Sequence, residues 1–149
     1  MENTAAVQQA YALQAELDNV AAVLRRHAAV SYKIYNIALE NNGSDSPLAI
    51  ASKAELDKLT DVMEELHIDF RINSFYFTFG SDEKFPYTRG QYLVVKAYDI
   101  NDAAAKFRSK YPNPEDNTVL NCADYYTQQE WDKRVKGFYK NEEPQEIIY

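Results

Sequence analysis

The chain has little of the residues on which most catalytic and metal centres depend. Its 149 residues include one cysteine, two histidines and four glycines. A single cysteine cannot form an internal disulfide, which favours a reducing, cytoplasmic location. The cysteine and histidines lack the spacing of a zinc site, and the glycines form no phosphate-binding loop. We therefore expect no catalytic residues, no metal and no cofactor, and we interpret the protein as a non-enzyme.

Long apolar runs and clustered basic residues are also missing. The sequence contains no run of roughly eighteen apolar residues, so we expect no membrane span, and its first residues do not resemble a signal peptide. The net charge is −7, and an acidic chain is poorly suited to gripping phosphate backbones, so we expect no direct binding to nucleic acid. The negative charge either keeps the protein soluble or forms a surface that competes for a basic, nucleic-acid-binding partner.

The composition changes near residue 70. Of the twenty aromatic residues, three lie in residues 1–69 and seventeen in residues 70–149, whereas thirteen of the eighteen alanines come before residue 55. Alanine-rich segments favour helices, and aromatic residues favour strands. The sequence therefore predicts two domains, a helical hairpin or coiled-coil-like segment over 1–69 and a sheet domain over 70–149.

The first domain should begin with a long helix, from residue 4 to about residue 41, because this segment has neither Gly nor Pro. Its apolar residues recur with a spacing of four and three, as in a coiled coil, which predicts a helix–helix interface and a possible homodimer. A helix of this length either projects in part or breaks near residues 27–31. The interface residues predicted from this spacing are Leu13, Leu17, Val20, Leu24 and His27.

A second helix should follow, since Ser52 and Glu55 have the spacing of a capping box. Its apolar side would then consist of Leu56, Leu59, Met63 and Leu66. This helix is long enough to fold back on the first as a hairpin.

The second domain shows the alternation of a sheet. Residues 75–79 and 92–98 have the period-two pattern of strands, and residues 118–126 resemble a third strand. Helices should begin after Asp99 and after Thr127, the latter with a capping box to Glu130. The predicted fold class is α+β: a long helix and helical hairpin, followed by a small three-stranded ββαβα domain with helices on one face.

The loop over residues 81–90 is longer than a tight hairpin turn and carries two aromatic and four charged residues. Tyrosines on the neighbouring strands would suit a protein-binding surface, because they offer large contact area at low entropic cost. Packing of Phe85 and Tyr87 onto the sheet is the alternative. The predicted partner-binding residues are Tyr76, Asp82, Glu83, Phe85, Tyr87, Arg89 and Tyr92.

Several short segments in residues 73–140 resemble a small domain encoded by bacteriophages and mobile elements of gut bacteria. The segments are Phe75–Asp82, Phe85-Pro86, Gly90–Tyr92, Ala104–Arg108, Tyr111-Pro112, Cys122-Ala123 and Trp131. The domain has no assigned role, and the resemblance implies no catalytic residues. Small acidic phage-encoded proteins without an active site are often inhibitors of host defence, and anti-CRISPR proteins are among them. By this analogy, the resemblance implies an inhibitor of host defence.

The leading functional hypothesis is therefore a phage-type accessory protein in the host cytoplasm. It would bind and inhibit a nucleic-acid-handling defence protein such as a Cas nuclease. The alternative is a dimeric structural or regulatory phage protein that self-associates through its long helix.

Overall fold

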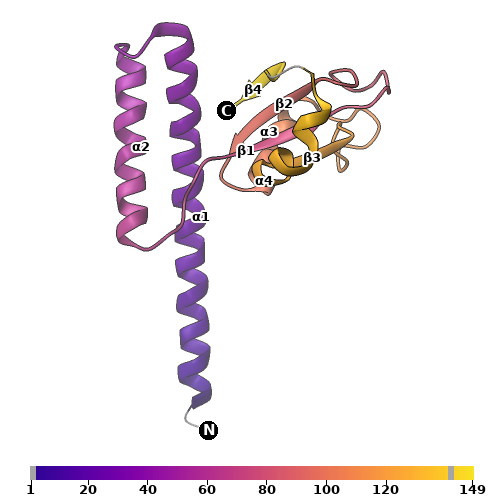
Figure 1. Ribbon diagram of the computed structural model, residues 1–149. Coiled ribbons are helices and arrows are strands. Elements are labelled where there is room, and N and C mark those ends of the chain that lie inside the picture. Colours follow the sequence, from indigo (N-terminus) through magenta and orange to yellow (C-terminus); the bar gives the residue numbers. More distant parts are fainter. Residues whose placement is uncertain (1–2, 141–142) are drawn as a thin grey trace. The chain divides into compact units, whose positions relative to one another are not determined.

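A computed structural model describes residues 3–140 and 143–149. The chain divides into two compact units, Met1–Phe70 and Arg71–Tyr149. The first is an antiparallel pair of helices, here called the hairpin unit, and the second is a small sheet with helices, called the sheet unit (Figure 1). The predicted α+β class is confirmed.

The hairpin unit consists of α1 (Asn3–Asn42) and α2 (Pro47–Glu65). Helix α1 is continuous through residues 27–31, and Gly43 follows it with a φ of 81°, the left-handed conformation that glycine adopts readily at a helix end. The predicted start of α2 at Ser52 is wrong. Ser46 is the N-cap, its Oγ accepting from the Ala49 amide at 3.2 Å, and Pro47 occupies the first turn.

Small residues hold the two helices together. Along α1 the residues that pack toward α2 follow a spacing of three and four, and along α2 they do the same. We call these two rows the hairpin seam: Ala21, Leu24, Ala28, Ser31, Tyr35 and Ala38 on α1, and Ala49, Ser52, Leu56, Thr60 and Met63 on α2. Seven of the eight buried residues of the hairpin unit are Ala or Ser, and Met63 is the eighth.

The sheet unit contains four strands in the order β3-β1-β2-β4. Strands β1 (Asn73–Thr78) and β2 (Tyr92–Ala97) form the predicted antiparallel pair, with Phe75 opposite Val95. The predicted third strand over 118–126 is wrong in position: β3 covers Asp124–Thr127, antiparallel to β1. A fourth strand, β4 (Glu146–Ile148), lies parallel to β2 and was not predicted.

One face of this sheet carries the main hydrophobic core. Helix α3 (Ile100–Lys110) covers it, capped by Asp99, whose carboxylate accepts from the Asp102 amide at 2.7 Å. The rings of Phe77 and Phe107 stack with centroids 4.5 Å apart, and neither side chain is exposed to solvent. The burial of these large aromatic groups stabilises the unit.

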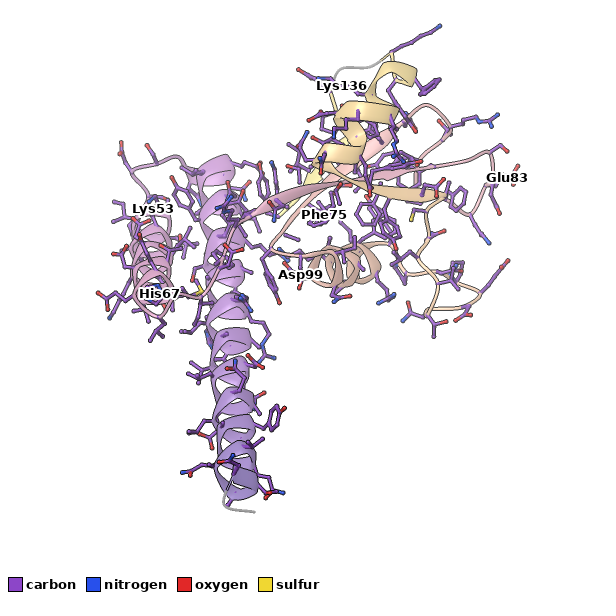
Figure 2. The ribbon with its side chains drawn as sticks, turned by 60° about the horizontal axis from the view of Figure 1, so that its bottom comes forward. Lys53, His67, Phe75, Glu83, Asp99 and Lys136 are labelled. Carbon is purple, nitrogen blue, oxygen red and sulfur yellow. The ribbon has the colours of Figure 1, made fainter. Side chains whose placement is uncertain are left out.

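The opposite face is covered by the short helix α4 (Gln128–Glu130), the π-helical turn η1 (Trp131–Val135) and the 3-10 turn η2 (Lys136–Phe138). Figure 2 shows α3, which begins after the labelled Asp99, and the segment with Lys136 on opposite sides of the sheet. The expectation of helices on one face only is therefore corrected.

The capping box between Thr127 and Glu130 is confirmed, but the helix that it opens is shorter than expected. Trp131 is buried and Val135 is half-buried. Phe138 is 84% exposed, whereas a regular α-helix continued from Thr127 would place it on the same side as Trp131 and Val135. The π-helical turn shifts the phase of the chain by about one residue, so the 3.6-residue spacing used for the prediction does not hold across it.

Among the described residues, no helix has both the length and the apolarity needed to cross a membrane.

Candidate functional site

The most prominent exposed apolar surface of the chain is a row of large side chains along α1. Six residues at a spacing of three, four or seven are each between 38% and 55% exposed. We call this row the apolar stripe: Leu13, Val20, Val23, Val30, Ile34 and Ile37. Glu16 and His27, both exposed, occupy the two remaining positions of the same spacing. Residues at this spacing share one side of a helix, so the stripe is continuous over most of α1.

Exposed apolar residues of the second helical segment lie on the same side of the hairpin unit. In α1, Val23, Val30 and Ile37 each come directly before a residue of the hairpin seam, and in α2 Leu48 and Val62 do the same. Two antiparallel helices are related by a twofold axis perpendicular to the plane that contains them. Residues in equivalent positions beside the seam therefore emerge on one face.

We call this surface the apolar face of the hairpin. It comprises the stripe together with Leu48 (53% exposed), Val62 (37%) and Leu66 (52%). Contiguous exposed apolar residues of this kind mark interaction sites in soluble proteins.

The first half of α1 extends beyond the end of α2 (Figure 1). All residues from 3 to 20 are exposed, including Leu17 at 60% and Tyr11 at 73%. We call residues 3–20 the overhang. A single helix of about 27 Å, without a helix beside it in this unit, gains nothing from packing, so its apolar residues remain available for another chain.

The residues predicted for a helix interface divide between these surfaces. Leu13 and Val20 belong to the apolar stripe, and Leu17 lies exposed on the overhang. Leu24 is half-buried in the hairpin seam. His27 is exposed, because the buried neighbour in the seam is Ala28. The predicted row thus mixed two adjacent rows of the same helix, one covered by α2 and one not.

The residues predicted for partner binding in the sheet unit do not form one surface. Tyr76 and Tyr92 pack against Trp131 on the face of the sheet that carries η1. Phe85 and Tyr87 pack against Phe79 on the other face. This result favours the alternative interpretation of the two loop aromatics, namely packing onto the sheet.

The charged residues of the same loop lie outward. Asp82, Glu83 and Arg89 are exposed, and Glu83 lies on the loop away from the core (Figure 2). The Asp82 carboxylate accepts from the Lys84 amide at 3.1 Å, which orders the turn. These three side chains share a loop but do not join the tyrosines.

Tyr87 takes part in a polar cluster that closes β4 onto the sheet unit. The hydroxyls of Tyr87 and Tyr111 donate to the Glu146 carboxylate at 3.0 and 2.5 Å, and the Lys110 ammonium pairs with its other oxygen. Burial, together with the hydrogen bond to Tyr111, raises the pKa of Tyr87 to about 12. Both oxygens of this carboxylate are engaged within the unit, so the cluster is structural in character.

An aromatic cluster lies on the face that carries η1. The Tyr76 and Trp131 rings stack at 4.5 Å with an interplanar angle of 9°, and Tyr92 and Tyr139 contact Trp131 at 4.6 and 4.9 Å. A cavity of about 380 Å³ opens beside them, with Lys96, Asp132 and Lys136 among its polar lining. Trp131 and Tyr92 are 3% and 4% exposed, so the rings are already occupied by one another and offer little free area to a ligand.

The single cysteine is not a reactive site. Burial, reinforced by the negative charge of Asp124, raises the pKa of the Cys122 thiol to about 12. The thiolate is the nucleophile, and at neutral pH almost none of it would form here. Across the described parts of the chain, no group of three or more His, Cys, Asp or Glu side chains could hold a metal ion.

Sequence reasoning did not separate the apolar stripe from the hairpin seam. Val23, Val30 and Ile37 were not among the residues predicted for the helix interface. Their seven-residue spacing, combined with that of Leu13, Val20 and Ile34, was the signal of a second row.

No protein-family model matches the chain, and neither the curated proteins nor the solved structures contain a match to it.

Proposed function

We propose that this protein is a non-enzymatic binding protein that self-associates through the apolar face of its hairpin unit, and that it has a structural or regulatory role as a dimer. The observation that carries the proposal is the continuous row of large aliphatic side chains on α1, all at least 38% exposed. Monomeric proteins rarely expose contiguous apolar residues over such a length.

The energetic argument supports association. Removing a half-exposed Val, Leu or Ile from water is worth about 1 kcal/mol. The nine residues of the apolar face would together contribute about 9 kcal/mol per chain, and about twice that for two chains. Association costs on the order of 4–15 kcal/mol in lost freedom of motion, so the apolar contribution is of the size needed to offset that cost.

Sedimentation velocity over a range of concentrations tests the proposal. We expect the wild type to sediment with twice the 17.2 kDa mass of the chain at micromolar concentration. Val30→Asp places a charge in the middle of the stripe and should produce a monomer.

Ala22→Asp is the matched control for this experiment. Ala22 lies on the same helix and is exposed, but it belongs to neither the apolar stripe nor the hairpin seam. The Ala22→Asp variant should remain dimeric. A wild type that stays monomeric at all concentrations would contradict the proposal.

A second candidate is the inhibitor of a nucleic-acid-handling host protein, such as a Cas nuclease. The observation that favours it is the charge of α2, which carries five acidic residues and two lysines. All five acids are exposed: Glu55, Asp57, Asp61, Glu64 and Glu65. A dense row of carboxylates can compete with a phosphate backbone for a basic groove.

Binding to a purified RNA-guided nuclease, with and without its guide RNA, tests this second function. We expect a complex that the guide displaces and that weakens steeply with added salt, because exposed charges are screened. Replacing Asp57, Asp61 and Glu64 by their amides should weaken it at least tenfold. Unchanged affinity of the triple variant would argue against recognition by charge.

A further inference from the structure

We infer that the self-associated form is an antiparallel dimer in which the overhang of each chain packs on the apolar face of the other. The inference rests on the proposed function and specifies its partner, a second copy of this chain, and its register. It follows from three features of the hairpin unit: the extent of the apolar stripe, the length of the overhang and the area available.

The apolar stripe is centred near residue 25. It begins at Leu13 and ends at Ile37, and the two numbers add to 50. Val20 and Val30 have the same sum, as do Val23 and His27. Two α1 helices that cross a twofold axis at residue 25 therefore place Leu13 opposite Ile37 and Val20 opposite Val30, while Val23 faces His27 and Ile34 faces Glu16.

The overhang fits the space beside α2. It has eighteen residues, from 3 to 20, and α2 has nineteen, so both are about 27–28 Å long. In the antiparallel register, residues 8–26 of one chain lie along residues 24–42 of the other, which is the part of α1 that α2 accompanies. Residues 8–20 of this segment belong to the overhang, and residues 21–26 are the next six of α1. Each half of the dimer then becomes a bundle of three helices: the second half of α1, α2, and the overhang of the second copy.

The apolar residues of the overhang lie on the side that this bundle requires. Ala10, Leu13, Leu17 and Val20 keep a spacing of three and four, which makes one apolar side. Leu13 and Val20 face the stripe of the second copy. Ala10 and Leu17 continue the row of Leu24 and face the side of the second copy's α2. Leu48 and Val62 lie on that side of α2 and are themselves exposed.

A parallel dimer would leave part of this apolar surface exposed to solvent. With α1 beside α1 in the same direction, both overhangs would lie together, and neither would cover Leu48, Val62 or Leu66. The antiparallel register covers the stripe, the overhang and the flank of α2 at once.

The area of such an interface agrees with that of stable dimers. A helix about 10 Å across that sinks half its circumference into a groove over 27 Å buries about 400 Å². Each chain donates one overhang and receives one, so each buries about 800 Å². This is the area per partner of a standard specific interface.

One pair of opposite charges fits the same register. Glu16 occupies a position between Leu13 and Val20 in the spacing of the stripe. It would face Ile34 of the second copy, one residue from the exposed Lys33. An antiparallel arrangement brings these opposite charges within reach at both ends of the dimer. In a parallel arrangement Glu16 would face its own copy, and like charges repel.

Disulfide cross-linking measures the register directly. In a background of Cys122→Ser, Val20→Cys and Val30→Cys chains are prepared separately and then mixed under mild oxidation. Residue 20 of one chain lies opposite residue 30 of the other, so the mixture should form cross-linked dimers. Each variant alone should not, because equal residues are then about 15 Å apart and a disulfide requires less than about 7 Å between Cα atoms.

The outcomes separate the inference from the proposed function. A wild type that is monomeric by sedimentation overturns both. A dimer in which Val20→Cys alone cross-links readily is parallel, which overturns the inference and leaves self-association standing. Ala22→Cys, at an exposed position on another side of α1, controls for random collision, and its cross-linking should stay below one tenth of that of the mixture.

Discussion

The two units use their hydrophobic residues in opposite ways. In the hairpin unit the buried residues are mostly Ala and Ser, and thirteen of the seventeen large apolar side chains that the described chain exposes belong to this unit. In the sheet unit, Phe77, Phe107, Leu93 and Val95 are fully buried. The comparison shows that the sheet unit buries its large apolar groups in its core, whereas the hairpin unit leaves most of its own exposed.

The difference has a physical cause. Ala and Ser let two helix backbones approach closely, so a seam of small residues forms a hairpin but buries little apolar area. The sheet instead surrounds each large ring with strands and a helix, as the stacking of Phe77 on Phe107 shows. We therefore expect the sheet unit to be stable by itself and the hairpin unit to be stabilised by association.

The largest expected effect comes from removing a ring from the sheet core. Phe107→Ala deletes a fully buried side chain that stacks on Phe77 at 4.5 Å. It should lower the free energy of unfolding of the sheet unit by about 3–5 kcal/mol. Urea unfolding followed by fluorescence measures this unit alone, because Trp131 is the one tryptophan of the sequence.

The matched control is Phe138→Ala, at a side chain that is 84% exposed. It should change the free energy of unfolding by less than about 0.5 kcal/mol. Equal effects of the two substitutions would show that the core does not lie around Phe107.

An intermediate effect is expected from enlarging the hairpin seam. Ala28 is fully buried where α1 approaches α2, so Ala28→Leu forces the helices apart and should cost about 1–3 kcal/mol. Circular dichroism during thermal unfolding follows the helices. Ala22→Leu, at an exposed position of the same helix, should leave the midpoint unchanged, and a similar loss in both variants would contradict close packing at the seam.

A smaller effect should follow from removing the cap of α4. The Thr127 side chain accepts from the Glu130 amide, and the Thr127 amide in turn donates to the Glu130 carboxylate. Thr127→Ala removes the first bond and should destabilise the sheet unit by about 1 kcal/mol. Thr127→Ser retains a hydroxyl and should recover most of the loss in the same fluorescence measurement, whereas a cap without energetic value would leave all three proteins alike.

The smallest effect concerns alkaline pH. Burial raises the pKa of Tyr87 from 10.0 to about 12, so folding favours the neutral phenol. Its stabilisation is complete below pH 10 and is lost as the pH rises from 10 to 12. The urea midpoint of the sheet unit should fall over this range. It should fall less in Tyr87→Phe, which has no group to ionise, and an identical pH profile for both proteins would remove Tyr87 as a cause.

Much of the fold could be predicted because local signals agreed with the final contacts. Period-two runs located β1 and β2, and Asp99 and Thr127 marked helix starts that the structure confirms. The start of α2 was missed because two capping signals compete. Ser46 is followed by Pro47, which preorganises the first turn, and this outweighs the Ser52–Glu55 pattern inside the helix.

Other features depend on distant contacts that no local pattern contains. β4 has three residues, and its strand conformation comes from pairing with β2 and from the hydrogen bonds to Glu146. Residues 118–123 alternate like a strand but form turns, tied by Asp116 to Thr118. On α1, the sequence showed two adjacent apolar rows, and only the position of α2 decides which of them is covered.

The pairing of β4 with β2 also determines when the protein can fold during synthesis. All residues of the hairpin unit have left the ribosome once residue 70 emerges. Strand β2, in contrast, cannot pair with β4 until Glu146 emerges, 53 residues after its partner Leu93. Until then the outer edge of β2, with the apolar residues Leu93, Val94 and Val95, has no neighbouring strand. Open edges of this kind recruit other chains, so the nascent sheet unit is the part of the protein with the greatest need of a chaperone.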